Sequence, residues 1–152
     1  MSAPIHYMTI KVFAKEGDDA KQLRKSIEYF LPEEYENQKI TLEQEEALIE
    51  QGSDLSIYTA TLKKSRHLKD ALMRLKELLG KTQCEKVITQ ENRVDEKGAL
   101  YIRLDKKRFA EEREAELVDH GDCFHFKIML AAHPKTRERS IEVAKELFRN
   151  EQ

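Results

Sequence analysis

The sequence predicts an α+β domain, in which an antiparallel or mixed β-sheet packs its helices mainly on one face. Residues 5–14 and 123–132 alternate between apolar and polar side chains, as strands with one buried face do. Leucines recur at helical spacing within 68–79. Several expected strands follow one another as hairpins, which favours an α+β arrangement. The 152 residues suffice for one domain, 1–152, with a substantial core.

The first part of the chain is expected to form a strand, a helix and a hairpin. After the strand 5–14, residues 20–31 place apolar side chains at helical spacing, and the following proline ends this pattern. Residues 38–49 alternate imperfectly and are rich in glutamate, which is typical of a strand near a sheet edge. Residues 55–63 carry β-branched side chains and form the next strand. A turn at 52–54 would join these two strands.

The middle of the chain is expected to form two helices and a second hairpin. Ser65 is the expected N-cap of a helix that ends at Gly80. A short helix would follow over 82–90. Residues 94–104 then form a hairpin around a turn at 95–98, where a glycine takes the left-handed conformation.

The last part of the chain is expected to close the sheet and end in a helix. One charged helical turn over 105–113 and a short strand over 114–118 precede the strand 123–132. Pro134 suits the first position of a helix, where its missing N–H is not needed, so the final helix is expected to begin there and to reach Phe148.

Charge is distributed unevenly along the chain. Residues 33–50 contain seven glutamates and one lysine, whereas the whole chain has a net charge of only −2. This division indicates one acidic edge and one basic face, a weaker signal than the strongly basic character of a dedicated nucleic-acid binder. No apolar stretch approaches the ~20 residues of a membrane span, and the first ten residues lack a signal-peptide pattern. With two cysteines far apart in the sequence, we expect a cytoplasmic protein.

Three side chains near the closing strand form a conceivable partial zinc site. His120, Cys123 and His125 are close in sequence, but no second cluster supplies a clear fourth ligand. We therefore interpret them as a turn histidine and two outward strand residues, and we expect no metal and no cofactor. The sequence also lacks a G-x-S-x-G elbow, a P-loop and a G-x-G-x-x-G loop. We expect no enzyme; a hydrolase that uses His120 or His125 is the weakest hypothesis.

Basic side chains gather at three junctions between the expected elements. Two of these junctions are helix N-termini, where outward backbone N–H groups and the helix dipole favour an anion such as phosphate. A solvated charged surface is the commoner meaning of any single cluster, but three clusters at element junctions favour nucleic-acid binding. The expected RNA-binding residues are Lys63, Lys64 and Arg66, then Arg103, Lys106, Lys107 and Arg108, and finally Lys135, Arg137 and Arg139.

The outward residues of two strands add a second indication. If helices cover one sheet face, Tyr101, Arg103, His125 and Lys127 project from the other face. Aromatic and cationic groups on such a face can stack on bases and hold phosphates. Alternatively, this face packs against another subunit.

Several segments, taken in order, resemble an archaeal RNA-binding family described as predicted exosome subunits. The resemblance covers nearly the whole chain and is carried by Arg93-Val-Asp-Glu-x-Gly98, Tyr101-Ile-Arg-Leu-Asp-Lys106 and Ala131-Ala-His-Pro-Lys-x-Arg137. Membership would imply an α+β fold related to double-stranded-RNA-binding domains and to a ribosomal protein that holds rRNA. It would also imply no catalytic activity, no required cofactor and a link to exosome components. Two departures are Lys107, where glutamine is expected, and the turn after Gly52, which lacks a second glycine.

The leading hypothesis is a non-catalytic protein that recognises structured RNA mainly through its phosphate backbone, because A-form RNA hides its base edges in a deep major groove. The alternative is a protein–protein interaction module or a homodimer that uses the acidic edge 33–50.

Overall fold

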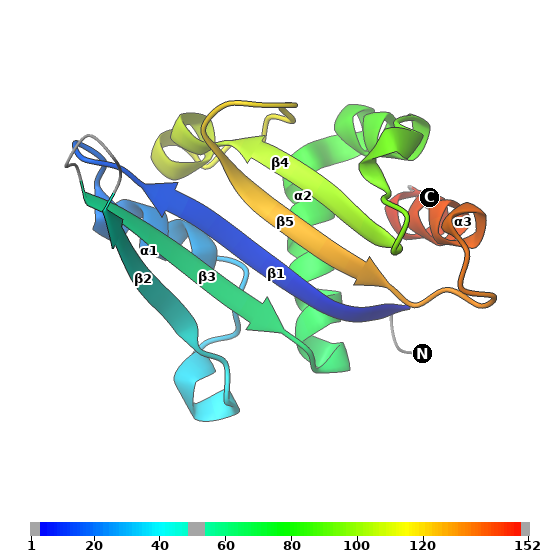
Figure 1. The fold of residues 1–152 in the computed structure, drawn as a ribbon, viewed down its shortest axis with the longest axis horizontal. Coiled ribbons are helices and arrows are strands. Elements are labelled where there is room, and N and C mark those ends of the chain that lie inside the picture. Colours follow the sequence, from blue (N-terminus) through cyan, green and yellow to red (C-terminus); the bar gives the residue numbers. More distant parts are fainter. Residues whose placement is uncertain (1–3, 49–53, 150–152) are drawn as a thin grey trace.

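The computed structural model describes residues 4–48 and 54–149, which form a five-stranded antiparallel sheet. The strand order is β2-β3-β1-β5-β4. The strands are β1 (Ile5–Ala14), β2 (Leu42–Leu48), β3 (Asp54–Leu62), β4 (Ala99–Asp105) and β5 (Cys123–Leu130). Every neighbouring pair runs antiparallel. Consequently β3 and β5 end at one end of the sheet, whereas β1 and β4 end at the other (Figure 1).

Helices cover one face of this sheet. The helices are α1 (Ala20–Glu28), α2 (Ser65–Thr89) and α3 (Arg137–Phe148). Figure 1 looks onto the uncovered face: α1 and α2 lie behind the sheet, and α3 lies beside the end where β5 finishes. The α+β prediction, with helices mainly on one face, is confirmed.

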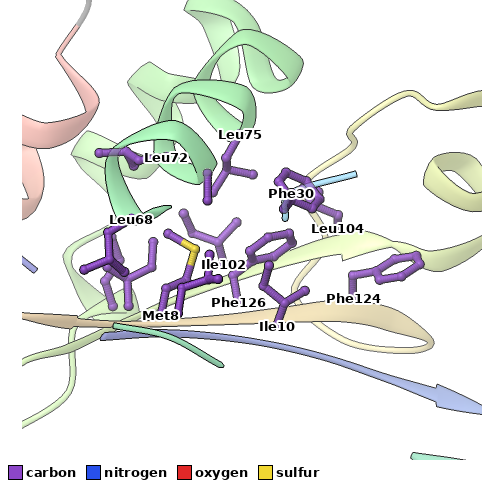
Figure 2. Packing of buried hydrophobic residues seen from close by; sticks show 14 of the residues in the cluster. Met8, Ile10, Phe30, Leu68, Leu72, Leu75, Ile102, Leu104, Phe124 and Phe126 are labelled. Atoms are coloured by element: carbon purple, nitrogen blue, oxygen red, sulfur yellow. The ribbon is translucent and has the colours of Figure 1, made fainter. Parts of the chain in front are cut away.

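The core lies between the sheet and the helices, as the strand and helix periodicities require. Met8 and Ile10 of the central strand β1 and Phe126 of the neighbouring β5 are fully buried. Figure 2 shows them facing Leu68 and Leu75 of α2, which belong to the predicted leucine stripe. Burying each of these side chains stabilises the fold by roughly 1.5–3 kcal/mol relative to exposure. The alternating apolar residues therefore fix which face of the sheet stays open.

The helix ends show where the sequence predictions were wrong by a few residues. The final helix begins at Arg137 rather than Pro134, because the side chain of Thr136 caps it by accepting a hydrogen bond from the Arg139 backbone N–H at 3.1 Å. Helix α2 begins at Ser65 itself, and its N-cap, Lys64, provides no side-chain hydrogen bond.

Gly80 divides α2 into two helices, as the sequence predicted. Its backbone has φ 72° and ψ 176°, which is not helical, so the first helix ends at this kink and the second reaches Thr89. This left-handed φ is one that glycine tolerates and other residues rarely adopt. Cys84 and Val87 in the second part are buried, as predicted for a short helix over 82–90.

The outer edge of β4 is covered by two short segments rather than by full strands. Val94 bridges to Leu100, and Leu117 bridges to Leu104. The backbone N–H of Val118 also donates to the Arg103 carbonyl at 3.0 Å. The short strand predicted over 114–118 is thus reduced to a single bridge at Leu117. In the hairpin predicted over 94–104, the first arm is reduced to the bridge at Val94, while the turn at 95–98 is present. The charged turn predicted over 105–113 is a single wide helical turn, η3 (Arg108–Glu112).

The opposite edge strand, β2, pairs only with β3 among the described residues. Its hairpin with β3 confirms the sequence prediction. A short helical turn, η1 (Tyr35–Gln38), takes the start of the segment that was expected to be strand. The turn expected at 52–54 lies mostly outside the described residues.

Candidate nucleic-acid interface

The uncovered sheet face carries rows of polar side chains that strand register brings together. Residues paired across neighbouring strands share a face, and neighbouring strands lie about 4.8 Å apart. One row consists of Arg103, His125, Lys11 and Thr59. The next row consists of Tyr101, Lys127, Thr9 and Thr61. The expectation that Tyr101, Arg103, His125 and Lys127 share the uncovered face agrees with this register.

Aromatic rings and cations alternate on this face. The Lys127 ammonium lies 5.8 Å from the centre of the Tyr7 ring, and the Arg103 guanidinium lies 5.9 Å from that of Tyr101. These are cation–π distances. A planar base could stack on such a ring or on the guanidinium plane while the cation holds a phosphate.

The charged side chains of the uncovered face differ between its two edges. Burial, and then the charges of Arg103 and Lys11, lower the pKa of His125 below its ordinary value of 6.5. Arg103 and Lys11 thus lie on either side of His125, on the two strands that flank β5. At the other edge of the sheet, Glu43 pairs with Thr59 and Glu45 pairs with Ile57, so β2 adds carboxylates to the same uncovered face. The uncovered face therefore carries cations on β4, β5 and β1 and glutamates on β2.

Two of the three predicted basic clusters lie at the same end of the sheet. Lys63 and Lys64 directly follow β3, and Lys135 follows β5; these two strands finish at the same end of the sheet, on either side of β1 (Figure 1). All three lysines are exposed, and so is Arg66. Arg66 donates a hydrogen bond to the Gln38 side chain at 3.2 Å. This end of the molecule therefore presents several accessible cations next to the start of α2.

A shallow pocket of about 340 Å³ lies at this lysine-rich end of the sheet and places one further cation, Lys39, beside Lys63 and Lys64. Lys39, Thr61, Lys63 and Lys64 contribute to its lining, together with Glu43. Lys39 follows η1 and is exposed. Sequence reasoning missed Lys39 because it lies inside the acidic segment 33–50.

The third predicted cluster lies at the opposite end of the sheet, and its members have different surroundings. Lys106 is buried, and its ammonium donates to Asp18 Oδ2 at 2.7 Å and to the Phe13 carbonyl at 3.1 Å. Arg108 is surrounded by carboxylates, including that of Glu114. Lys107 is exposed. Of this cluster, Arg103 alone belongs to the uncovered face.

Two cations of the last cluster also have partners inside the protein. Arg137 donates to the backbone carbonyls of Val94 and Glu91 at 3.0 and 2.9 Å, which ties α3 to the segment before β4. Arg139 forms an ion pair with Glu142 at 2.7 Å. Within this cluster, Lys135 has the most exposed position.

The conceivable zinc ligands are only partly brought together. Cys123 Sγ lies 3.4 Å from His125 Nε2. His120 is exposed and instead lines a pocket beside Asp18 and Lys106. Burial raises the pKa of the Cys123 thiol, so thiolate chemistry is disfavoured. Within 4–48 and 54–149 there is no group of three or more His, Cys, Asp or Glu side chains placed to bind a metal ion. Over the same ranges, no helix has the length and apolar character that crossing a bilayer requires.

Tyr7 and Lys11 belong to the uncovered face but were not among the predicted binding residues. Their signal is present in the sequence, because they alternate with Met8, Ile10 and Val12 along β1. What the alternation could not show is that β1 lies beside β5, and this neighbourhood places Lys11 opposite His125.

Comparisons with known proteins agree with a nucleic-acid interface. A family model described as "RNA binding" matches residues 7–130. An RNA-binding protein of Pyrococcus abyssi is 27% identical over 147 residues, which are 96% of this chain and 95% of the relative. A solved DUF54 protein of Archaeoglobus fulgidus is 29% identical with a TM-score of 0.80, over 94% of this chain and 99% of that one. Another DUF54 protein, from Methanothermobacter thermautotrophicus, is 26% identical with a TM-score of 0.76, over 95% and 98%. The chain belongs to this RNA-binding family.

Proposed function

We propose that this protein binds structured RNA through the uncovered face of its sheet and holds it mainly by its phosphate backbone. The observation that carries the proposal is the joint position of Lys11, Arg103 and Lys127 in two adjacent rows of that face. Arg103 and Lys127 each lie over an aromatic ring. Cations among aromatic groups suit a ligand that combines phosphates with planar bases.

The pairing of the charged groups supports this choice of surface. None of these three cations forms an ion pair with another residue in the described part of the chain, whereas Lys106 and Arg108 do. A cation without a carboxylate partner can neutralise a phosphate without first breaking an ion pair. The exposed lysines Lys63, Lys64 and Lys135 would extend the binding track beyond the end of the sheet.

The acidic strand β2 gives the proposed track a direction. Glu43 and Glu45 lie on the same face as Lys11, on the other side of β3. Their carboxylates repel the negatively charged phosphates of RNA. The RNA is therefore expected to cover β4, β5 and β1 and to leave the sheet at the lysine-rich end rather than across β2.

A salt titration of RNA binding tests the proposal. We would replace Lys11, Arg103 and Lys127 together by glutamine and measure affinity for duplex and single-stranded RNA by fluorescence anisotropy from 50 to 300 mM salt. Each phosphate contact contributes roughly 0.7–0.9 to the slope of log K against log salt concentration. The triple variant should therefore lower that slope by roughly 2–3 and weaken binding to both RNAs.

A matched control carries the same loss of charge on the helical side. Lys21 and Lys25 of α1 and Lys86 of α2 are exposed, and they belong to the helical layer. Replacing these three by glutamine should leave most of the slope and affinity. Equal losses in the two triple variants would show a non-specific charge effect, and RNA binding that survives the first triple variant would refute the proposed surface.

Two finer parts of the proposal concern what happens after binding. We propose that the protein acts by binding rather than by catalysis, and that it delivers or holds RNA for the exosome, as the family resemblance implies. Co-purification of exosome subunits with the tagged protein, before and after ribonuclease treatment, tests the second part. Subunits that persist after treatment would indicate direct contact, and their absence in both samples would refute the association.

A further inference from the structure

A polar pocket of about 430 Å³ opens at the outer edge of β4, beside the uncovered face. Tyr101 and Arg103 of β4 form one wall, so the pocket is continuous with the proposed RNA surface. Gln90, Asn92 and Arg93 come from the segment between α2 and β4, and Asp119 comes from the connection before β5. Its volume lies near the lower limit for small-ligand sites, which is suitable for part of one nucleotide.

Arg93 occupies a gap in the coverage of the β4 edge. Val94 bridges to Leu100 on one side of this gap, and Val118 donates to the Arg103 carbonyl on the other. Between them, Arg93 Nη1 lies 3.4 Å from the Tyr101 carbonyl. Its Nε–H donates to Gln90 Oε1 at 2.7 Å. These contacts hold the guanidinium group in one orientation at the pocket wall.

The guanidinium group of Arg93 keeps unused donors. A guanidinium group has five N–H donors, and the two hydrogen bonds above are the ones that this group of Arg93 makes within the described ranges. Its Nη2 lies 3.8 Å from Asp119, beyond hydrogen-bond distance, and the Asp119 side chain is 86% exposed. The Arg93 side chain is only 6% exposed, and it lines the pocket.

Two guanidinium groups face one exposed carboxylate in this pocket. Burial lowers the pKa of Arg93, Asp119 opposes this change, and the positive charge of Arg103 lowers the pKa further. The two arginines therefore repel each other, and an anion between them would remove that repulsion. A guanidinium group held in a fixed orientation is suited to bidentate binding of phosphate oxygens.

We propose that this pocket binds one phosphate group of the RNA, with Arg93 and Arg103 as its two cationic ligands and Asn92 as a hydrogen-bond donor. The proposal rests on the proposed function, because it treats the pocket as a fixed anchor at one side of the RNA surface. The phosphate can be an internal phosphodiester or the monoester at an RNA end, and the two sources share this chemistry.

Side-chain NMR on the wild-type protein provides the first test. Adenosine monophosphate and adenosine would be titrated separately while the Arg93 Nε–H and Asn92 amide signals are followed. Both signals should shift with the monophosphate and stay in place with the nucleoside. Equal responses to the two compounds would overturn the phosphate assignment, and no response to either compound or to RNA would overturn the pocket altogether.

RNA ligands then distinguish the source of the phosphate. One short RNA would be used with a 5′-monophosphate and with a 5′-hydroxyl group. Shifts at Arg93 with both forms indicate an internal phosphodiester, and shifts with the first form alone indicate the terminal monoester. If RNA moves the signals of Lys11 and Lys127 but not those of Arg93 and Asn92, the pocket proposal fails and the proposed function stands.

A charge substitution tests the pocket without disturbing the Arg93 contacts. Asn92 is exposed, so Asn92→Asp should fold normally while placing a second carboxylate in the pocket. We expect a loss of at least roughly 10-fold in affinity for adenosine monophosphate, comparable to one lost charge-assisted hydrogen bond. The matched control is Asn37→Asp on η1, which is also exposed and lines a different part of the surface. Equal effects of the two substitutions would overturn the proposal.

Discussion

Replacing Lys106 tests whether a residue of a predicted RNA-binding cluster serves stability instead. Its side chain is 9% exposed, and its ammonium contacts Asp18, the Phe13 carbonyl and, at 3.8 Å, Asp122. Lys106→Met keeps most of the buried methylene chain and removes the charge. The carboxylates would then lose their buried partner, and the Phe13 carbonyl would lose a donor.

The expected cost follows from the exposure of the partners. Removing one member of a fully buried ion pair costs about 3–5 kcal/mol. Asp18 is 30% and Asp122 is 51% exposed, so water can solvate both carboxylates after the substitution. We therefore expect Lys106→Met to lower the free energy of unfolding by about 2–3 kcal/mol. For a chain of this size that corresponds to roughly 4–12 °C in Tm.

The neighbouring lysine supplies the control. Lys107 is exposed, and Lys107→Met should change stability by no more than about 0.5 kcal/mol. Urea denaturation followed by circular dichroism measures stability, and fluorescence anisotropy measures RNA affinity under conditions where each variant is folded. The reasoning is refuted if Lys106→Met retains full stability, or if the folded variant loses RNA affinity while Lys107→Met retains it.

Three further perturbations have defined outcomes. Burial alone would raise the pKa of Asp18, but hydrogen bonds from Lys106 and from a backbone N–H lower it below 3.8 overall. The ionised Asp18 therefore stabilises the fold at neutral pH, and this contribution is lost as the pH falls through the folded-state pKa. Urea titrations between pH 7 and pH 2 should show that Asp18→Asn loses less stability on acidification than the wild type. Replacing Glu43 and Glu45 by glutamine should tighten RNA binding by several-fold at 50 mM salt. At 300 mM the affinity should change little, because salt screens exposed charges. An unchanged affinity at low salt would place the RNA away from β2. Gly98→Ala should destabilise the fold by roughly 1–3 kcal/mol. Gly98 has a φ of 88°, and an added Cβ would lie 2.9 Å from Ser140 Oγ. A melting temperature equal to that of the wild type would contradict this prediction.

The layers of the fold could be predicted from the sequence because burial alternates regularly. In β1 and β5 the apolar positions identify the covered face, and Leu68 and Leu75 identify the covering side of α2. The exact start of α3 could not be predicted in the same way. Pro134 and Thr136 both suit a helix start, and the choice of Thr136 depends on the loop that leads from β5.

The candidate site was only partly predictable because a charge in the sequence does not reveal its partner. The alternation of β4 puts Ile102 and Leu104 on the covered face, and the same parity points to Lys106, which is buried. That signal was present in the sequence but was outweighed by the basic cluster around it. The acids that neutralise Lys106 come from distant segments: Asp18 precedes α1, and Asp122 precedes β5. Long-range pairing of this kind has no local pattern.

Both edges of the sheet carry features that oppose pairing with a further strand. An edge strand with free backbone groups is a template for adding strands from other chains, which leads to aggregation. Along β4, the segments around Val94 and Leu117 occupy that template. Along β2, alternate positions carry Glu43 and Glu45, so two copies that approached edge to edge would bring carboxylates together. The uncovered face can therefore stay open for a ligand without making the sheet prone to fibre-like growth.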